Sequence, residues 1–549
     1  MNRVVTSTLL LTLVCAMWFR VQGLNRSLWL DEAWVANSVL ESTVPRMLFY
    51  DAWVPSPEPG FLLASRLVTG WLGPSNRSFR IVPAAFSLIS LLAMLFLLRK
   101  LFPPVWLTFG FALFALSPAA ILFARTFKQY STQLAMAPVL LLAAVHCNQR
   151  PSPRNFTVLL VTILVATVFS YPSVFLLPAL AILLVQPRSE ESIEPAHVKQ
   201  AVLAALWGLA VFIFLYVVVI RHNVNDSLRL FFANPAVGVL GHLSRAVTSF
   251  ITPYELLLPI PGRLLDSTTH PVRFLASLGV VAIATVFYRR QKNCRLWLML
   301  AVLLPQIAVM LLDLLNLYPA NEKTMLFLLP CRVILVTSLV ESVMATAAAL
   351  VPGEAWRRTV RYTAPLATML ILAIGSLKQL RLPSSFRYEE DVQDAIAWLD
   401  TTFRDGDALY VHASVQEEFK LYARLLSFAP SAVQWGNTGW PCCPRRIEYW
   451  GGHGSVHLIE EDVARLYPIS LPSRLWELHS LRSSHWEYVG LDEGKVIRAL
   501  LLQRGCVLTL YREWHNVAVS QFDCIVPDQA TGPRAPATTP PSRAISQTR

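Results

Sequence analysis

Long blocks of apolar residues recur along roughly the first 380 residues of this chain, and they limit its fold more than any other feature. Hydrophobic residues make up 54% of the sequence and charged residues only 15%, a balance that excludes an ordinary soluble protein. A helix needs about 20 mostly apolar residues to cross a membrane. We therefore expect a polytopic α-helical membrane protein. The spans, about eleven, are expected at residues 4–21, 81–98, 105–123, 131–147, 156–169, 173–185, 201–220, 274–288, 296–315, 325–350 and 362–377.

Two of these spans, 156–169 and 173–185, are short and meet at Ser170-Tyr171-Pro172. They fit either two tilted helices with a tight outer turn or one broken re-entrant pair. The choice changes the number of spans by an even number, so the side on which the chain ends stays the same.

Lysine and arginine gather in alternate short loops, and this sets the expected orientation. Basic residues are retained on the cytoplasmic side of a membrane. The loops concerned carry Arg99 and Lys100, Arg150 and Arg154, Arg188 and Lys199, Arg289, Arg290, Lys292 and Arg295, and Arg357, Arg358 and Arg361. The N-terminus is then cytoplasmic, and the first span is an uncleaved helix because no small-residue cleavage site is evident. The net charge of +12 reflects this topology and does not indicate a nucleic-acid partner.

The alternation places several segments on the outer face of the membrane. They are the large first loop 24–80, the turn 125–130, the loop 222–272, the loop 318–323 and the chain after about residue 378.

The chain changes character near residues 382–385, where mixed polarity replaces the apolar runs. Helix-like periodicity covers 389–403 and 416–426, and strand-like segments lie at 408–412, 454–458 and 506–511. We expect a small extracytoplasmic α/β domain at 381–526, after a transmembrane domain at 1–380. The Pro-, Thr- and Ser-rich tail 527–549 is expected to be disordered.

Eight cysteines divide between the two parts of the chain, with Cys442, Cys443, Cys506 and Cys524 in the expected α/β domain. An oxidising compartment permits disulfides. Vicinal cysteines are poorly spaced for zinc, so bridges are favoured. The sequence does not fix the pairing, although Cys506 with Cys524 is compatible with it.

Two adjacent carboxylates, Asp31 and Glu32, open the first loop directly after the first span. A carboxylate pair at a membrane surface is costly unless it has a function. The alternative is that both merely cap the helix that follows, since acidic side chains complement free N–H groups at a helix N-terminus.

Several motifs occur in a fixed order on this outer face. They are Asp31-Glu32, the Pro-rich Pro55-Ser56-Pro57-Glu58-Pro59, Arg80-Ile81-Val82-Pro83, Ser117-Pro118 with the following segment Arg125-Thr126-Phe127-Lys128-Gln129-Tyr130, and Lys323 after Leu317-Tyr318-Pro319. Together they resemble the membrane glycosyltransferases of the protein mannosyltransferase and aminoarabinose transferase group (glycosyltransferase family 39-like), which have the GT-C fold. The resemblance covers residues 1–380. It departs at Glu58-Pro59, where many relatives have a His-Pro-Pro segment, and it lacks an evident second acidic residue after the third span.

The resemblance implies inverting transfer of a sugar from a polyprenyl-phosphate donor to an acceptor hydroxyl on the outer face of the inner (plasma) membrane of a bacterium. Asp31 is the expected catalytic base, with Glu32 a weaker candidate. The expected contacts of the donor phosphate are Arg125, Lys128, Tyr130 and Lys323. Glu58 is the expected acceptor contact. The acceptor is a glycan, lipid or protein, the surroundings are membrane lipids, and the one cofactor left open is a divalent metal ion.

Ordinary explanations exist for the same residues. Lys and Arg at span ends commonly extend to lipid headgroups, and interfacial Tyr is common. A lipid or glycan transporter or flippase is the alternative function, and Asp313 and Glu341, within or near spans, are its first residues to examine. A scaffold whose outer domain binds cell-wall partners is a third reading.

Overall fold

A computed structural model of the chain describes residues 3–50, 57–186, 194–223, 294–315, 317–318, 323–350, 390–412, 415–430, 433–435, 474–481 and 493–524. The expected spans 274–288 and 362–377, the strand 454–458, the cysteines at 442 and 443 and the tail 527–549 lie outside them.

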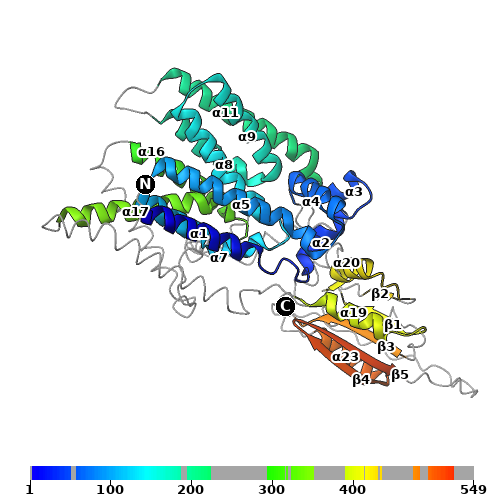
Figure 1. Ribbon diagram of the computed structural model, residues 1–549. Helices are drawn as coiled ribbons and strands as arrows, with labels where there is room; N and C mark the ends of the chain where they lie inside the picture. The colour runs from blue at the N-terminus through cyan, green and yellow to red at the C-terminus, as the bar shows by residue number, and fades with distance from the viewer. Residues whose placement is uncertain are drawn as a thin grey trace, which may run out of the picture.

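The N-terminal part is helical (Figure 1). Its elements are α1 (Arg3–Val21), α2 (Leu30–Val39), α3 (Val44–Leu48), α4 (Pro59–Leu72), α5 (Asn76–Leu101), α6 (Pro104–Ala115), α7 (Pro118–Ala124), α8 (Tyr130–Gln149), α9 (Pro153–Phe169), η1 (Tyr171–Leu176), α10 (Leu177–Val185), α11 (Pro195–Leu215), η2 (Tyr216–Ile220), α12 (Arg221–Asn223), α16 (Cys294–Leu314), η5 (Leu326–Leu328) and α17 (Leu329–Leu350). Helices occupy each expected span that falls within the described residues.

Within the described part of the chain, four helices are long and apolar enough to cross a membrane by length and composition. They are Asn76–Leu101, Tyr130–Gln149, Pro195–Asn223 and Leu326–Ala345. The chain is therefore a multi-pass membrane protein. Shorter apolar helices lie at Val5–Val21, Pro153–Phe169, Tyr171–Val185 and Trp297–Asp313.

The expected span 105–123 differs from a single helix, because α6 and α7 meet at a bend of 50°. Pro118 lacks an N–H group and disfavours a helical conformation at Ser117. Ser117 instead accepts a hydrogen bond from the Ala120 N–H and caps α7. The bend brings the end of α7 to the turn at residues 125–129, which carries candidate site residues.

Close helix packing builds the membrane part. Helix α5 lies along α8, and α8 lies along α9. Helix α6 approaches α17 at Gly110, where an added Cβ would lie 2.7 Å from Oγ1 of Thr337. A glycine therefore allows these two helices to touch.

The C-terminal unit consists of a five-stranded sheet with α19 (Val392–Thr402), α20 (Gln416–Leu426) and α23 (Glu493–Gln503). Its strands are β1 (Ala408–Val411), β2 (Val433–Trp435), β3 (Arg474–Ser480), β4 (Cys506–Trp514) and β5 (Val517–Cys524), in the order β2-β1-β3-β5-β4. Strands β2, β1 and β3 are parallel, and β3, β5 and β4 are antiparallel. The helix at 416–426 has the bounds expected from the sequence.

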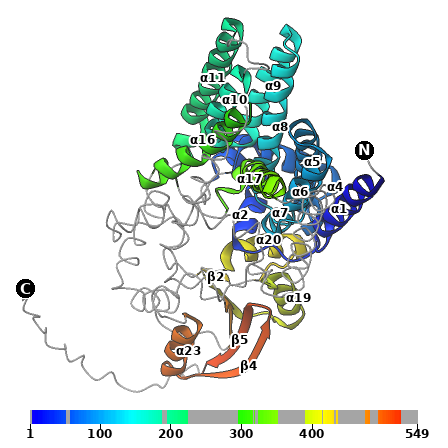
Figure 2. The same ribbon diagram turned by 90° about the vertical axis from the view of Figure 1, so that its left-hand side faces the viewer.

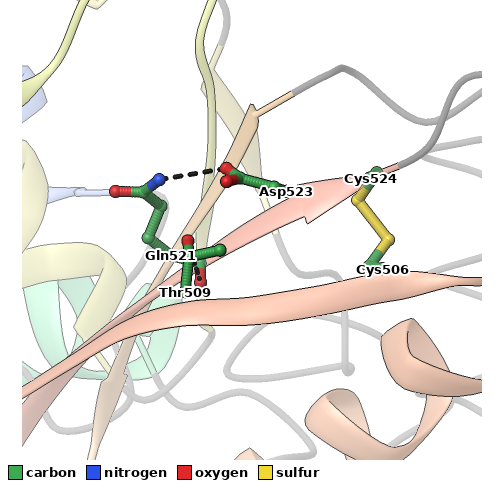
Figure 3. The surroundings of a disulfide bond; sticks show 5 residues. All are labelled: Cys506, Thr509, Gln521, Asp523 and Cys524. Atoms are coloured by element: carbon green, nitrogen blue, oxygen red, sulfur yellow. Dashed lines mark hydrogen bonds between the residues drawn. A yellow bond between two sulfur atoms is a disulfide. The ribbon is translucent and has the colours of Figure 1, made fainter.

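A disulfide joins Cys506 and Cys524, which face one another in the register of β4 and β5 (Figure 3). It pairs the start of one strand with the end of the next and closes the outer hairpin of the sheet. The pairing that was compatible with the sequence is therefore present.

One face of the sheet packs against α19 and α20, and these helices pack against the first loop. A single apolar cluster spans both parts of the chain. Its buried members include Trp34, Phe61, Phe79 and Phe127 from the N-terminal part and Ile396, Phe419, Trp476 and Val519 from the C-terminal unit. Figures 1 and 2 both show α20 beside α2, which places the C-terminal unit against the helix that carries Asp31.

Candidate active site

Asp31, in the first turn of α2, is the centre of the candidate site. The Nζ atom of Lys128 lies 4.0 Å from its Oδ2 atom, and the Nζ atom of Lys323 lies 4.0 Å from the same oxygen. The Asp31 side chain stays 25% exposed. The structure thus brings together three of the residues expected from the sequence, with a carboxylate between two ammonium groups.

The two lysines differ in their surroundings. Lys128, in the turn between α7 and α8, is 2% exposed, whereas Lys323 is 28% exposed. Burial lowers the pKa of the Lys128 ammonium below its usual range, Asp31 opposes this shift, and the charge of Lys323 adds to it.

Lys323 is held beside α2 by an aromatic ring. Its Nζ atom lies 5.2 Å from the centre of the Trp29 ring, which favours a cation. Nearby, the Tyr318 hydroxyl donates to the Thr324 carbonyl at 2.9 Å and braces the segment that presents Lys323. Sequence reasoning gave Tyr318 no role.

Glu32 belongs to a different contact from Asp31. Its Oε1 and Oε2 atoms accept hydrogen bonds from Nε and Nη2 of Arg80 at 3.1 and 2.7 Å, and the pair is buried. The Phe127 N–H also donates to Oε1, and the Trp29 N–H donates to Oε2. Both oxygens of Glu32 are therefore engaged, which does not support its expected role as a second base. Glu32 caps α2, and Asp31 does not.

Arg80 also binds the chain that leads into α2. Its guanidinium donates to the carbonyls of Leu24, Arg26 and Ser27, so one side chain fixes both Glu32 and the preceding segment. The sequence placed Arg80 in a motif but gave it no role of its own. Its place within Arg80-Ile81-Val82-Pro83, next to an apolar span, was the available signal.

Arg125 and Tyr130 flank Lys128 in the same turn. Arg125 ends α7 and is half-buried, and Tyr130 begins α8. The Tyr130 ring packs edge-on against Phe123 at 4.9 Å. Both residues therefore belong to the same turn as Lys128.

Glu58, the expected acceptor contact, lies in a buried polar pocket and is 1% exposed. Its Oε1 atom accepts hydrogen bonds from Nε2 of Gln133 at 2.7 Å and from the Tyr171 N–H at 3.2 Å. Burial raises the pKa of Glu58 to about 7. In this arrangement the protein covers Glu58, which does not support direct contact with an acceptor.

Arg20 is a buried charged residue to which the sequence gave no role. It lies in α1, is fully buried, and donates to Ser87 Oγ at 2.8 Å and to the Ala115 carbonyl at 2.7 Å. Ala115 ends α6, at the bend before α7. A lone charge within an apolar span was the signal, because such residues are costly and usually functional.

The described residues hold neither a cluster suited to a metal ion nor an exposed carboxylate at Asp313 or Glu341. Among the described residues, no group of three His, Cys, Asp or Glu side chains could hold a metal ion. Asp313 in α16 and Glu341 in α17, on which a transport pathway would depend, are buried within packed helices.

The chain is similar to several solved structures. ArnT from Cupriavidus metallidurans bound to undecaprenyl phosphate matches with a TM-score of 0.52 at 13% identity, over 96% of this chain and 100% of that one. ArnT in the apo state matches at 0.49 and 12% identity, over 94% and 98%. The oligosaccharyltransferase AglB from Archaeoglobus fulgidus, in complex with an inhibitory peptide and a dolichol-phosphate, matches at 0.46 and 13% identity, over 96% and 75%.

The fold is therefore that of the GT-C membrane proteins, as the sequence predicted. Within that class, the fold is similar to that of ArnT, in a match that covers 96% of this chain. No protein-family model matches the sequence, and no curated protein matches it.

Proposed function

We propose that this protein is an inverting glycosyltransferase that moves a sugar from a polyprenyl-phosphate donor to an acceptor hydroxyl at the outer face of the inner (plasma) membrane. The observation that carries the proposal is the Asp31 carboxylate, partly open to solvent, with the ammonium groups of Lys128 and Lys323 each 4.0 Å from one of its oxygens. The shared fold with ArnT, which was solved with undecaprenyl phosphate, supports it.

Asp31 acts as the general base. It accepts the proton of the acceptor hydroxyl while that oxygen attacks the anomeric carbon of the donor sugar. The bond from this carbon to the phosphate oxygen breaks, and the phosphate leaves with the electron pair. A single displacement inverts the configuration of the anomeric carbon.

Lys128 and Lys323 stabilise the leaving phosphate. Negative charge grows on the phosphate as the glycosidic bond breaks, and fixed cations are most effective where charge develops. Arg125 and Tyr130, in the same turn as Lys128, are assigned to the same phosphate. Glu32 and Arg80 hold the start of α2, and Glu58 has no part in this step.

The test is Asp31→Asn in purified protein reconstituted in vesicles and offered a set of lipid-linked sugars. The amide keeps the shape of the side chain but cannot accept the proton, so turnover should fall by about 10² to 10⁴. Donor affinity, measured separately, should change little. Asp400→Asn, an exposed carboxylate on α19, is the matched control and should keep full turnover. Near wild-type turnover in Asp31→Asn would refute the proposal.

A further inference from the structure

Helix α20 of the C-terminal unit contacts the end of α2 through a buried carboxylate. The Nδ2 atom of Asn37, in α2, donates to the Glu417 carbonyl at 2.9 Å and to Oε2 of Glu417 at 2.8 Å. The Tyr50 hydroxyl donates to the same Oε2 at 3.1 Å, and Lys420 donates to Oε1 at 2.6 Å. Glu417 is 3% exposed. A charge so well buried and bonded fixes the geometry around it.

The same helix contacts the other end of α2. The Tyr422 hydroxyl accepts a hydrogen bond from the Leu28 N–H, two residues before α2 begins. It donates to Oδ1 of Asn76 at 3.0 Å. Asn76, at the start of α5, in turn donates to Gln393 of α19 at 2.7 Å. Tyr422 therefore links the first loop, α5 and the C-terminal unit.

Apolar packing fills the space between these two polar contacts. Nearly every side chain of α2 after Asp31 is buried, and Trp34, Val35 and Val39 share one cluster with Phe419 and Tyr422. A short helix bonded at both ends and packed along its length has little freedom to slide or rotate.

We propose that α20 positions α2, and with it the Asp31 carboxylate, so that Glu417 and Tyr422 of the C-terminal unit are positioning residues for sugar transfer. This inference rests on the proposed function. Asp31 lies six residues before Asn37 on the same helix, so a shift at Asn37 moves Asp31 relative to Lys128 and Lys323. A misplacement of about 1 Å can lower a rate roughly 100-fold.

The first test is a double-mutant cycle with Asn37→Asp and Glu417→Gln in the full-length reconstituted protein. Asn37→Asp puts a second carboxylate against Glu417, so turnover should fall roughly 10- to 100-fold while the KM for the lipid-linked donor changes less than threefold. In the Glu417→Gln background, Asn37→Asp should lower turnover by a factor at least five times smaller, because the amide at position 417 can donate to the new carboxylate.

The second test is Tyr422→Phe, which removes only the hydroxyl that holds Leu28 and Asn76. Turnover should fall at least fivefold with donor affinity retained. Arg424→Ala, an exposed position on the same helix, is the control and should leave turnover unchanged.

Thermal unfolding midpoints of the same variants separate this inference from the proposed function. An active wild type in which Asn37→Asp and Tyr422→Phe both turn over normally would overturn the positioning role alone. A uniform loss in donor binding instead of turnover would also overturn it. A wild type that transfers no sugar would overturn the proposed function and the positioning role together, even if the midpoints show coupling between Asn37 and Glu417.

Discussion

At the scale of single residues, Lys128 is an unusual feature of the site. A buried ammonium group is costly unless it is paired, and the Nζ atom of Lys128 lies 4.0 Å from the Asp31 carboxylate that it shares with Lys323. Two cations on one carboxylate leave an excess of positive charge. That excess suits an anionic ligand, and it suits a phosphate at a membrane surface.

Neutralising either lysine tests this reading. Lys128→Ala and Lys323→Ala should each weaken donor binding and lower turnover, because the charges meet the phosphate both before and during transfer. The combined loss in donor affinity and turnover should be about 10- to 100-fold for each variant. The loss should be larger for Lys128→Ala, because Lys128 is buried. The measurements are donor affinity and turnover, with Lys100→Ala, exposed near the end of α5, as control. Unchanged affinity in both variants would contradict a phosphate role.

Glu58 should make stability depend on pH. An unfolded Glu titrates near pH 4.3, whereas burial raises the folded pKa to about 7. Between these values the folded protein keeps a proton that the unfolded chain releases, so stability falls as pH rises through this range and levels off above it. The loss in the free energy of unfolding amounts to about 4 kcal/mol.

Thermal midpoints at pH 5 and pH 8 measure this effect. Glu58→Gln should remove most of the decline seen in wild type and should be the more stable of the two at pH 8. Asp405→Asn, an exposed carboxylate, should follow wild type. An equal change in thermal midpoint between pH 5 and pH 8 for wild type and Glu58→Gln would show that Glu58 ionises normally.

At the scale of elements, the start of α2 depends on the Glu32–Arg80 ion pair. Arg80→Met leaves the Glu32 carboxylate buried without its partner, which typically costs about 3–5 kcal/mol. Adding Glu32→Met to Arg80→Met should reverse only part of the decrease in the thermal unfolding midpoint, since Arg80 also binds three carbonyls. The yield of folded protein and its midpoint are the measurements. Full stability in Arg80→Met alone would mean that this pair does not hold α2.

The sequence predicted these elements better than their contacts. Apolar length located the helices, and the ordered motifs on one membrane face, through their resemblance to GT-C glycosyltransferases, were enough to expect Asp31, Lys128 and Lys323 in one site. The pairing of Glu32 with Arg80 could not be read from spacing, because it depends on how the first loop folds back onto α5. The bend at Ser117-Pro118 had a local signal in proline, but continuous hydrophobicity outweighed it in the span assignment.

At the scale of the whole molecule, the expected orientation can be tested with cysteines in exposed positions. Gln503→Cys, in α23, should react with a membrane-impermeant thiol reagent in intact spheroplasts. Gln149→Cys, at the end of α8, should react only after the membrane is permeabilised. The parent protein supplies the background. The reverse pattern would place the C-terminal unit and the Asp31 site on the cytoplasmic side.

The apolar cluster that α2 shares with α19 and α20 also bears on protein engineering. A cut near residue 381 looks like a natural boundary, yet it would strip the apolar faces of α2 and α20 of their cover and expose them to water. Exchanging the C-terminal unit for that of another protein would meet the same obstacle. A working chimaera would have to carry over the matching face of α2 and the Asn76 region of α5, so the transferable module is discontinuous in the chain.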